Sequence, residues 1–201
     1  LAATDMSVMI FGENGTGKEH IAHHLHDKSK RAGKPFVAVD CGSLTKELAP
    51  SAFFGHVKGA FTGADSTKKG YFYEAEGGTL FLDEVGNLAL ETQQMLLRAI
   101  QERRYRPIGD KSDRSFNVRI IAATNEDLEA AVSEKRFRQD LFYRLHDFGI
   151  TVPPLRDCQE DILPLAEFFR EIANKELECN VSGFSSEARK ALLTHAWPGN
   201  V

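Results

Sequence analysis

The glycine-rich segment that follows Phe11 constrains the fold of this chain more than any other feature. It consists of Gly12, Glu13, Asn14, Gly15, Thr16, Gly17 and Lys18. An apolar run at residues 8–11 precedes it, and apolar residues at helical spacing follow it, so the segment joins a strand to a helix. Glycines let the backbone curl so that its N–H groups surround phosphate oxygens at a helix N-terminus, and the lysine adds a positive charge. The segment predicts a loop that binds nucleotide phosphates, and the alternative is a glycine-rich turn that carries a lysine by chance.

Four further apolar runs predict strands, and helical segments separate most of them. The runs lie at residues 36–39, 80–82, 118–123 and 148–152. Apolar strands that alternate with helices are typical of an α/β fold with a mainly parallel sheet, in which ligands gather at the carboxyl ends of the strands. Together with the run before the phosphate loop, they predict a sheet of five strands between helices.

The prolines of Pro153-Pro154 end this alternation, because proline removes a backbone donor and restricts the residue before it. We therefore expect a nucleotide-binding subdomain at residues 1–154 and a small helical subdomain at residues 155–201. In the second subdomain, apolar positions at helical spacing predict a helix over residues 162–177, and Ser185 is a candidate cap for another helix.

Two adjacent carboxylates, Asp83 and Glu84, directly follow the apolar run at residues 80–82. Asp83 would hold Mg²⁺, directly or through water, and Glu84 would orient and polarise the water that attacks the γ-phosphate. An acidic pair after a strand is also a common solvated strand end, but the earlier Lys18 favours the catalytic interpretation. The sequence therefore predicts an ATPase that uses ATP and Mg²⁺. One departure from the general pattern is Glu19, because Ser or Thr usually follows the lysine and holds Mg²⁺.

Composition limits the partners and the compartment. The net charge of −4 gives no reason to expect a broad basic face, so tight unaided binding to nucleic-acid backbones is not expected. Cys41, Cys158 and Cys179 are odd in number and far apart, which fits neither a disulfide framework nor a zinc ribbon and favours a reducing cytoplasm. No stretch approaches the roughly 20 apolar residues that a membrane helix needs.

The most specific motif of the chain lies at residues 59–64. It consists of Gly59, Ala60, Phe61, Thr62, Gly63 and Ala64. This motif resembles the signature of bacterial enhancer-binding proteins, the AAA+ activators of sigma-54 RNA polymerase of the nitrogen-regulatory and phage-shock type. The resemblance runs from about Ser7 to Val201, with further matching segments at residues 12–19, 53–56, 77–84, 122–125 and 197–200. In that family glutamate follows the lysine of the phosphate loop, so Glu19 fits the resemblance.

The resemblance implies a function and a set of partners. It implies an AAA+ P-loop ATPase with a helical lid, which self-associates into a hexameric or heptameric ring. Its partner is the sigma-54 RNA polymerase holoenzyme, and ATP hydrolysis drives remodelling of the closed promoter complex into an open one. The loop near residues 55–70 would contact the sigma factor through Phe61 and Thr62 at its tip. The alternative for this loop is a glycine-bounded hairpin with Phe61 packed in the core.

Arg138 and Arg144 match the paired arginine fingers of the family, which a neighbouring subunit supplies to the γ-phosphate, so activity would require oligomerisation. Their spacing of six helical residues corresponds to a rotation of about 600°, so they cannot share a face and we expect unequal roles. The alternative is that they are surface arginines paired with Asp140 or another acid.

Two further residues match family positions near the γ-phosphate. Asn125 matches sensor I, whose amide detects the γ-phosphate or the attacking water, and its alternative role is a cap for the following helix. Asp40 matches a position where many relatives carry asparagine, thought to hydrogen-bond the catalytic glutamate and to relay the nucleotide state to the loop. Neighbouring carboxylates repel, so we expect Asp40 to share a proton or a water with Glu84.

The resemblance also implies parts that this sequence lacks. The family continues after Val201 with the sensor II arginine, and we expect impaired hydrolysis without it. Members usually bind enhancer DNA through a C-terminal helix-turn-helix, and they often carry an N-terminal receiver or ligand-sensing domain. The rival interpretations are another AAA+ remodelling ATPase, such as a chelatase or helicase-like subunit, and a nucleotide-dependent switch. The motif at residues 59–64 favours the activator.

Overall fold

The computed structural model describes all 201 residues, and their contacts divide the chain into two compact units. The first unit consists of Leu1–Phe11 and Lys18–Thr151, and the second consists of Gly12–Gly17 and Val152–Val201. The phosphate loop therefore packs with the C-terminal segment, although it is covalently joined to the first unit at both of its ends.

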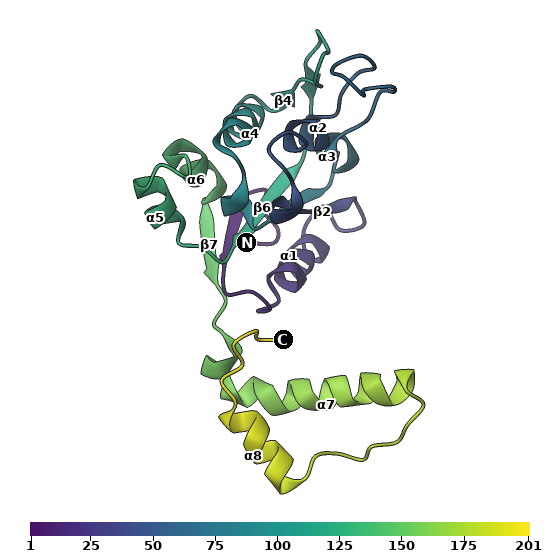
Figure 1. Ribbon diagram of the computed structural model, residues 1–201, viewed down its shortest axis with the longest axis vertical. Coiled ribbons are helices and arrows are strands. Elements are labelled where there is room, and N and C mark those ends of the chain that lie inside the picture. The colour runs from purple at the N-terminus through teal and green to yellow at the C-terminus, as the bar shows by residue number, and fades with distance from the viewer. The chain divides into compact units, whose positions relative to one another are not determined.

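The first unit is built on a five-stranded sheet in the order β2-β3-β6-β1-β7, in which every pairing is parallel (Figure 1). Its strands are β1 (Val8–Phe11), β2 (Phe36–Asp40), β3 (Thr79–Asp83), β6 (Arg119–Thr124) and β7 (Phe148–Thr151). All five strands confirm the runs expected from the sequence, with ends that differ by at most one residue. The α/β fold with a parallel sheet is therefore confirmed, and the buried apolar strands β3 and β6 show why continuous apolar runs indicate it.

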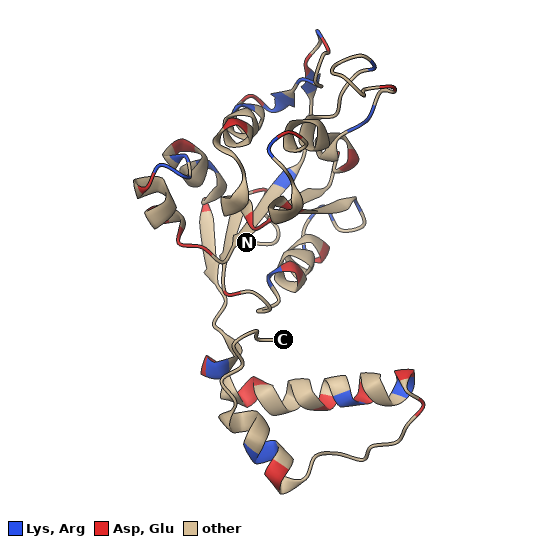
Figure 2. Ribbon diagram, viewed as in Figure 1, with Lys and Arg blue, Asp and Glu red and all other residues tan.

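Helices surround this sheet (Figure 1). They are α1 (Lys18–Asp27), α2 (Ala49–Phe54), α3 (Tyr71–Glu74), α4 (Leu90–Glu102), α5 (Leu128–Ser133) and α6 (Gln139–Leu145). The core between them contains the fully buried Phe53, Phe72 and Phe81, and burial of each such side chain contributes about 1.5–3 kcal/mol. A small antiparallel hairpin of β4 (Arg104–Tyr105) and β5 (Arg114–Ser115) projects beyond the sheet, and Figure 2 shows its basic residues.

Arg119, the first residue of β6, is buried with only 1% of its surface exposed. Its guanidinium donates hydrogen bonds to the carbonyl oxygens of Leu1, Ala2 and Met6 at 3.2, 3.0 and 3.3 Å. Burial lowers the pKa of Arg119. The residue ties the N-terminal segment to the amino end of the sheet, because a buried guanidinium requires partners for its donors.

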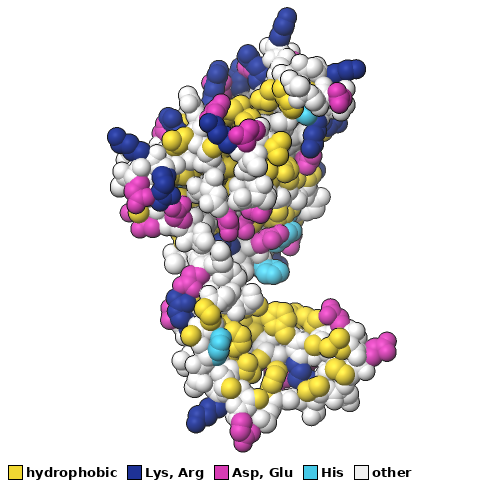
Figure 3. All heavy atoms as spheres, viewed as in Figure 1, with side chains coloured by type: hydrophobic (Ala, Val, Ile, Leu, Met, Phe, Trp, Pro, Cys, Tyr) yellow, Lys and Arg dark blue, Asp and Glu magenta, His cyan; other side chains and the backbone are white.

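The second unit contains two α-helices, α7 (Gln159–Glu176) and α8 (Ser186–Thr194). Ser185 accepts a hydrogen bond from the backbone N–H of Ala188 at 3.2 Å, which confirms it as the cap of α8. Hydrophobic side chains gather over these helices (Figure 3). Phe168 and Phe169 are both exposed. None of the helices in the chain combines the length and apolar character that a membrane crossing requires.

Candidate nucleotide site and projecting loop

The phosphate loop has the backbone geometry that its glycines allow. Gly15 and Gly17 have φ angles of 75° and 81°, in the left-handed region that L side chains rarely adopt. A Cβ at Gly15 would also lie 2.1 Å from the carbonyl oxygen of Gly199, so only glycine fits there. Thr16 Oγ1 donates to the carbonyl oxygen of Glu13 at 2.8 Å and closes the turn. Lys18 follows as the first residue of α1 and is only 6% exposed.

Hydrogen bonds from Arg156 and Asn200 join the phosphate loop to the C-terminal segment. The sequence did not predict these contacts. Arg156 donates two hydrogen bonds to the Glu13 carboxylate, at 2.8 and 2.5 Å. Asn200 is buried, and its amide donates to the Asn14 carbonyl oxygen at 2.9 Å and to Glu13 Oε2 at 3.3 Å. The Asn200 oxygen accepts from the N–H of Leu155 at 2.8 Å. Glu13 was expected among the nucleotide-binding residues, and in this structure its carboxylate bonds to the second unit's own Arg156.

Because of these bonds, the contribution of Glu13 to the stability of the fold should depend on pH. The hydrogen bonds from Arg156 and then from Asn200 lower the pKa of Glu13 from 4.5 to about 2. A carboxylate whose pKa is lowered on folding stabilises the fold above its unfolded pKa, and this contribution disappears as the pH falls through the folded pKa. We therefore expect the difference in melting temperature between wild type and Glu13→Gln to be largest above pH 4.5 and to shrink towards pH 2.

The control for this prediction is Glu47→Gln, because Glu47 is exposed and makes no ion pair. Its melting temperature should follow that of wild type across the same pH range. A Glu13→Gln difference that does not change with pH would contradict the proposed ionic attachment.

At the carboxyl ends of β2 and β3, the carboxylates of Asp40, Asp83 and Glu84 gather. Asp40 and Asp83 are partners in the parallel register, and Glu84 follows directly. Asp83 Oδ1 accepts from the N–H of Glu84 at 3.0 Å. Burial raises the pKa of the Cys41 thiol, and the nearby charges of Asp40, Asp83 and Glu84 raise it further. The register of β2 and β3 thus places three carboxylates at this edge of the sheet.

These residues fit Mg²⁺ of the kind that arrives with a nucleotide. No group of three or more His, Cys, Asp or Glu side chains forms a complete metal cage in the chain. Mg²⁺ typically needs only one or two carboxylates, because waters and substrate phosphates provide its other ligands. Asp83 therefore remains the candidate ligand predicted from the sequence.

Asp40 and Glu84 bind different donors. Asp40 Oδ1 accepts from the N–H of Gly42 at 2.8 Å, and Glu84 Oε2 accepts from the side-chain amide of Asn87 at 2.9 Å. No direct hydrogen bond joins the two carboxylates, which contradicts a directly shared proton, and coupling through a shared water stays a prediction.

Asn125 follows β6 and is exposed. Because β6 lies beside β3 in a parallel sheet, Asn125 is at the same edge as Asp83. The alternative role of Asn125 as a helix cap is wrong, because Asp127 caps α5 by accepting from the N–H groups of Glu129 and Ala130.

The two candidate finger arginines lie at opposite ends of α6. Arg138 precedes the helix and forms a two-point ion pair with Asp140, at 3.0 and 2.8 Å. Arg144 lies in the last turn, is exposed and makes no ion pair. The expectation that both arginines lie on one helix is wrong, because Arg138 is the extended residue that precedes α6. The alternative pairing with Asp140 describes Arg138 in this structure, but not Arg144.

The loop at residues 59–64 is closed at its base and exposed at its tip. The N–H of Gly59 donates to the Ala64 carbonyl oxygen at 2.8 Å, and the N–H of Ala64 donates to the Phe61 carbonyl oxygen at 3.0 Å. Phe61 is 47% exposed, and its ring centroid lies 5.0 Å from that of His56. Thr62 is exposed beside it. The alternative with Phe61 in the core is therefore wrong.

The segment that follows β4 packs against the loop at residues 59–64. The sequence did not predict this contact. Val57 and Ile108 are joined by a hydrogen bond from the N–H of Val57 to the Ile108 carbonyl oxygen at 3.0 Å. The N–H of Ile108 donates to the Gly55 carbonyl oxygen at 2.9 Å. A Cβ at Gly109 would lie 2.7 Å from Cβ of Ala60, so the two segments pack closely.

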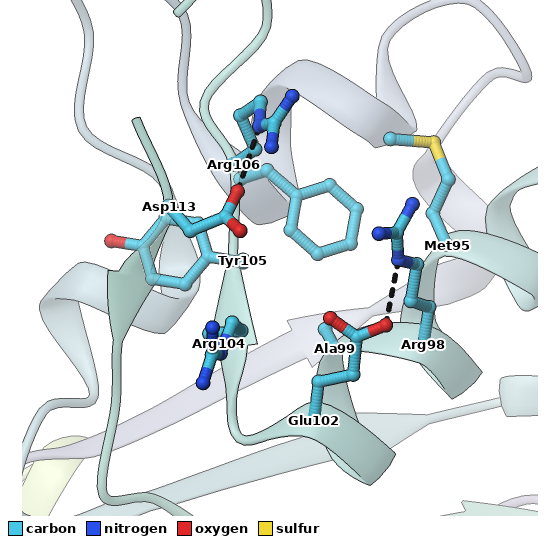
Figure 4. Close-up of a pocket in the computed structure, with 9 residues that line it drawn as sticks. Met95, Arg98, Ala99, Glu102, Arg104, Tyr105, Arg106 and Asp113 are labelled. Carbon is cyan, nitrogen blue, oxygen red and sulfur yellow. Dashed lines mark hydrogen bonds and ion pairs between the residues drawn. The ribbon is translucent and has the colours of Figure 1, made fainter. Parts of the chain in front are cut away.

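A separate cavity of about 170 Å³ lies among α2, α4 and β4 (Figure 4). The ion pairs Arg98–Glu102 and Arg106–Asp113, at 2.9 and 2.7 Å, lie along it. None of the candidate nucleotide or loop residues lines this cavity.

Comparison with known proteins gives matches along the whole chain. The family model described as Sigma-54 interaction domain matches residues 1–151, and the AAA+ ATPase lid domain matches residues 156–201. The transcriptional regulatory protein ZraR of Klebsiella oxytoca is 49% identical over 100% of this chain and 45% of its own length. The DNA-binding transcriptional regulator NtrC of Rhizobium meliloti is 46% identical over 100% of this chain and 41% of its own length.

A solved structure is similar throughout. The structure of NtrX from Brucella abortus in complex with ADP has a TM-score of 0.92 and 36% identity, and the match covers 100% of this chain and 44% of that one. The chain thus spans less than half the length of these relatives.

Proposed function

Because this chain belongs to the Sigma-54 interaction domain family, we propose that it couples ATP hydrolysis to the remodelling of sigma-54 RNA polymerase from the closed to the open promoter complex. The observation that carries the proposal is the loop at residues 59–64. It presents an aromatic ring and a hydroxyl, those of Phe61 and Thr62, at an exposed tip. Such a tip offers both apolar contact and hydrogen bonding to a protein partner.

The hydrolytic step is assigned to the residues around the phosphate loop. The N–H groups of the loop and Lys18 bind the phosphates, and Glu84 orients the attacking water and accepts its proton. Mg²⁺ held by Asp83 would neutralise phosphate charge. Asn125, at the same sheet edge, detects the γ-phosphate or the water. The ADP and ATP complexes of the similar NtrX support nucleotide binding here.

The ring form is part of the proposal. In a hexameric or heptameric ring, Arg138 or Arg144 would reach the γ-phosphate of a neighbouring subunit, and the other would steady the interface. Arg138 must leave Asp140 to serve as a finger, whereas Arg144 makes no ion pair to break. In this proposal the nucleotide-binding subdomain comprises residues 1–154, the lid comprises residues 155–201, and enhancer DNA is bound by another domain.

The decisive experiment is complex formation with sigma-54. The full chain is incubated with sigma-54 and an ATP transition-state analogue, and the complex is resolved by size-exclusion chromatography. We expect wild type and Ser66→Ala to form the complex and Thr62→Ala to lose it, because Ser66 is exposed just after the loop at residues 59–64 and away from its tip. Absence of a wild-type complex would reject the activator function. Equal binding by Thr62→Ala would reject only the role of the tip.

A further inference from the structure

We propose that Asn87 is a positioning residue that orients Glu84 for catalysis, an inference that rests on the proposed role of Glu84 in ATP hydrolysis. The side-chain amide of Asn87 donates a hydrogen bond to Glu84 Oε2 at 2.9 Å. The backbone N–H of Asn87 also donates to the Glu84 carbonyl oxygen, at 3.0 Å. One residue of the short turn Val85–Asn87 thus fixes both the carboxylate and the backbone of Glu84.

The backbone of Glu84 needs such support. Its φ and ψ angles of 50° and 44° lie in the left-handed region, which is unfavourable for a residue with a Cβ. This conformation turns the chain at the end of β3. The backbone bond from Asn87 stabilises the turn, and the side-chain bond holds the Glu84 carboxylate in one orientation.

The bond from Asn87 also makes the two carboxylate oxygens of Glu84 different from each other. Oε2 is occupied by the amide, whereas Oε1 accepts no hydrogen bond from the protein. An amide donates a hydrogen bond without giving up its proton, so it orients the carboxylate and leaves it able to act as a base. Oε1 is then the oxygen that accepts a proton from the attacking water.

Gly42 lies beside the hydrogen bond between Asn87 and Glu84. A Cβ at Gly42 would lie 2.6 Å from Glu84 Oε2 and 3.1 Å from the Asn87 amide nitrogen, so the hydrogen bond passes directly beside this glycine. Asp40 Oδ1 accepts from the N–H of Gly42. An ionised aspartate has no donor to offer Glu84, and Asn87 supplies the donor that Asp40 lacks.

The test compares ATP hydrolysis by wild type, Asn87→Ala and Asn87→Asp in the full chain. We expect kcat to fall roughly ten- to hundredfold in both variants, because one hydrogen bond to a charged group contributes about that factor. The decrease should be larger for Asn87→Asp, which adds a repelling carboxylate. KM, the affinity for a fluorescent ADP analogue and the melting temperature should remain close to those of wild type.

A second substitution provides the readout that a merely structural role would not give. Adding Asp40→Asn to Asn87→Asp places an amide on the opposite side of Gly42, and we expect it to restore much of the lost kcat. Asn180→Ala is the matched control, because Asn180 is exposed and lies in the second unit.

Three results separate the possible failures. An unchanged kcat in Asn87→Ala would overturn the inference. A parallel loss of kcat, nucleotide affinity and melting temperature without rescue would also overturn it, since Asn87 would then be a structural residue. If wild type itself does not hydrolyse ATP, or if Glu84→Gln hydrolyses it at the wild-type rate, the proposed function fails irrespective of Asn87.

Discussion

Glu84→Gln is expected to lower kcat for ATP hydrolysis by roughly 10²- to 10⁴-fold, the range that a positioned general base contributes. Glutamine retains the shape and one oxygen of the side chain, so the hydrogen bond from Asn87 is preserved. It cannot accept the proton of the attacking water, and hydrolysis therefore slows while the phosphate loop is untouched. Affinity for ATP should stay near that of wild type, measured with a fluorescent nucleotide analogue.

The control is Glu47→Gln, which makes the same chemical change at an exposed position outside the cluster of carboxylates. Its hydrolysis rate should equal that of wild type. A Glu84→Gln variant that hydrolyses ATP at a normal rate would assign the base to another residue. A variant that loses nucleotide binding would make Glu84 a structural residue of the strand end.

The sheet was predictable from the sequence because each of its strands is marked by a local run of apolar residues, and this pattern recurs along the chain. Each strand of the buried sheet is a continuous apolar run, as β3 and β6 illustrate. The β4–β5 hairpin was not predicted, because its strands are only two residues long and therefore show no alternation. The phosphate loop was predicted from its glycines, and the φ angle of Gly15 shows why that position requires one.

The contacts of the site were less predictable, because they depend on which side chains meet in space. Glu13 and Arg156 are separated by 143 positions, and many other charged pairs were possible. The sequence placed Asp40 and Glu84 near each other, but it could not show that the local amide of Asn87 takes the Glu84 oxygen. Likewise, only the packed structure distinguishes an exposed Phe61 beside His56 from a buried one.

Gly78→Ala is expected to destabilise the fold more than Gly77→Ala or Gly183→Ala, because the new methyl group would meet rigid backbone. Its Cβ would lie 1.9 Å from the carbonyl oxygen of Pro35, which accepts a hydrogen bond from the N–H of Thr79 at 2.9 Å. Relief of the clash requires β2 and β3 to move apart where they begin to pair. Overpacking typically costs 1–3 kcal/mol, and we expect roughly 3 kcal/mol here because no flexible side chain can yield.

Gly77→Ala separates this steric effect from backbone strain at the neighbouring position. Gly77 has a φ of 77°, but nothing lies within 4 Å of the position of its Cβ. Its substitution should cost only about 1–2 kcal/mol, the strain of a left-handed residue with a Cβ. Gly183→Ala, with no positive φ and no neighbour, should be nearly neutral.

Urea unfolding followed by circular dichroism measures the stability of all three variants, because the single tryptophan, Trp197, lies in the second unit and its fluorescence does not report on the sheet. If Gly78→Ala costs no more than Gly77→Ala, the strands can separate at Pro35, and the start of the sheet is less rigid than its hydrogen bonds indicate.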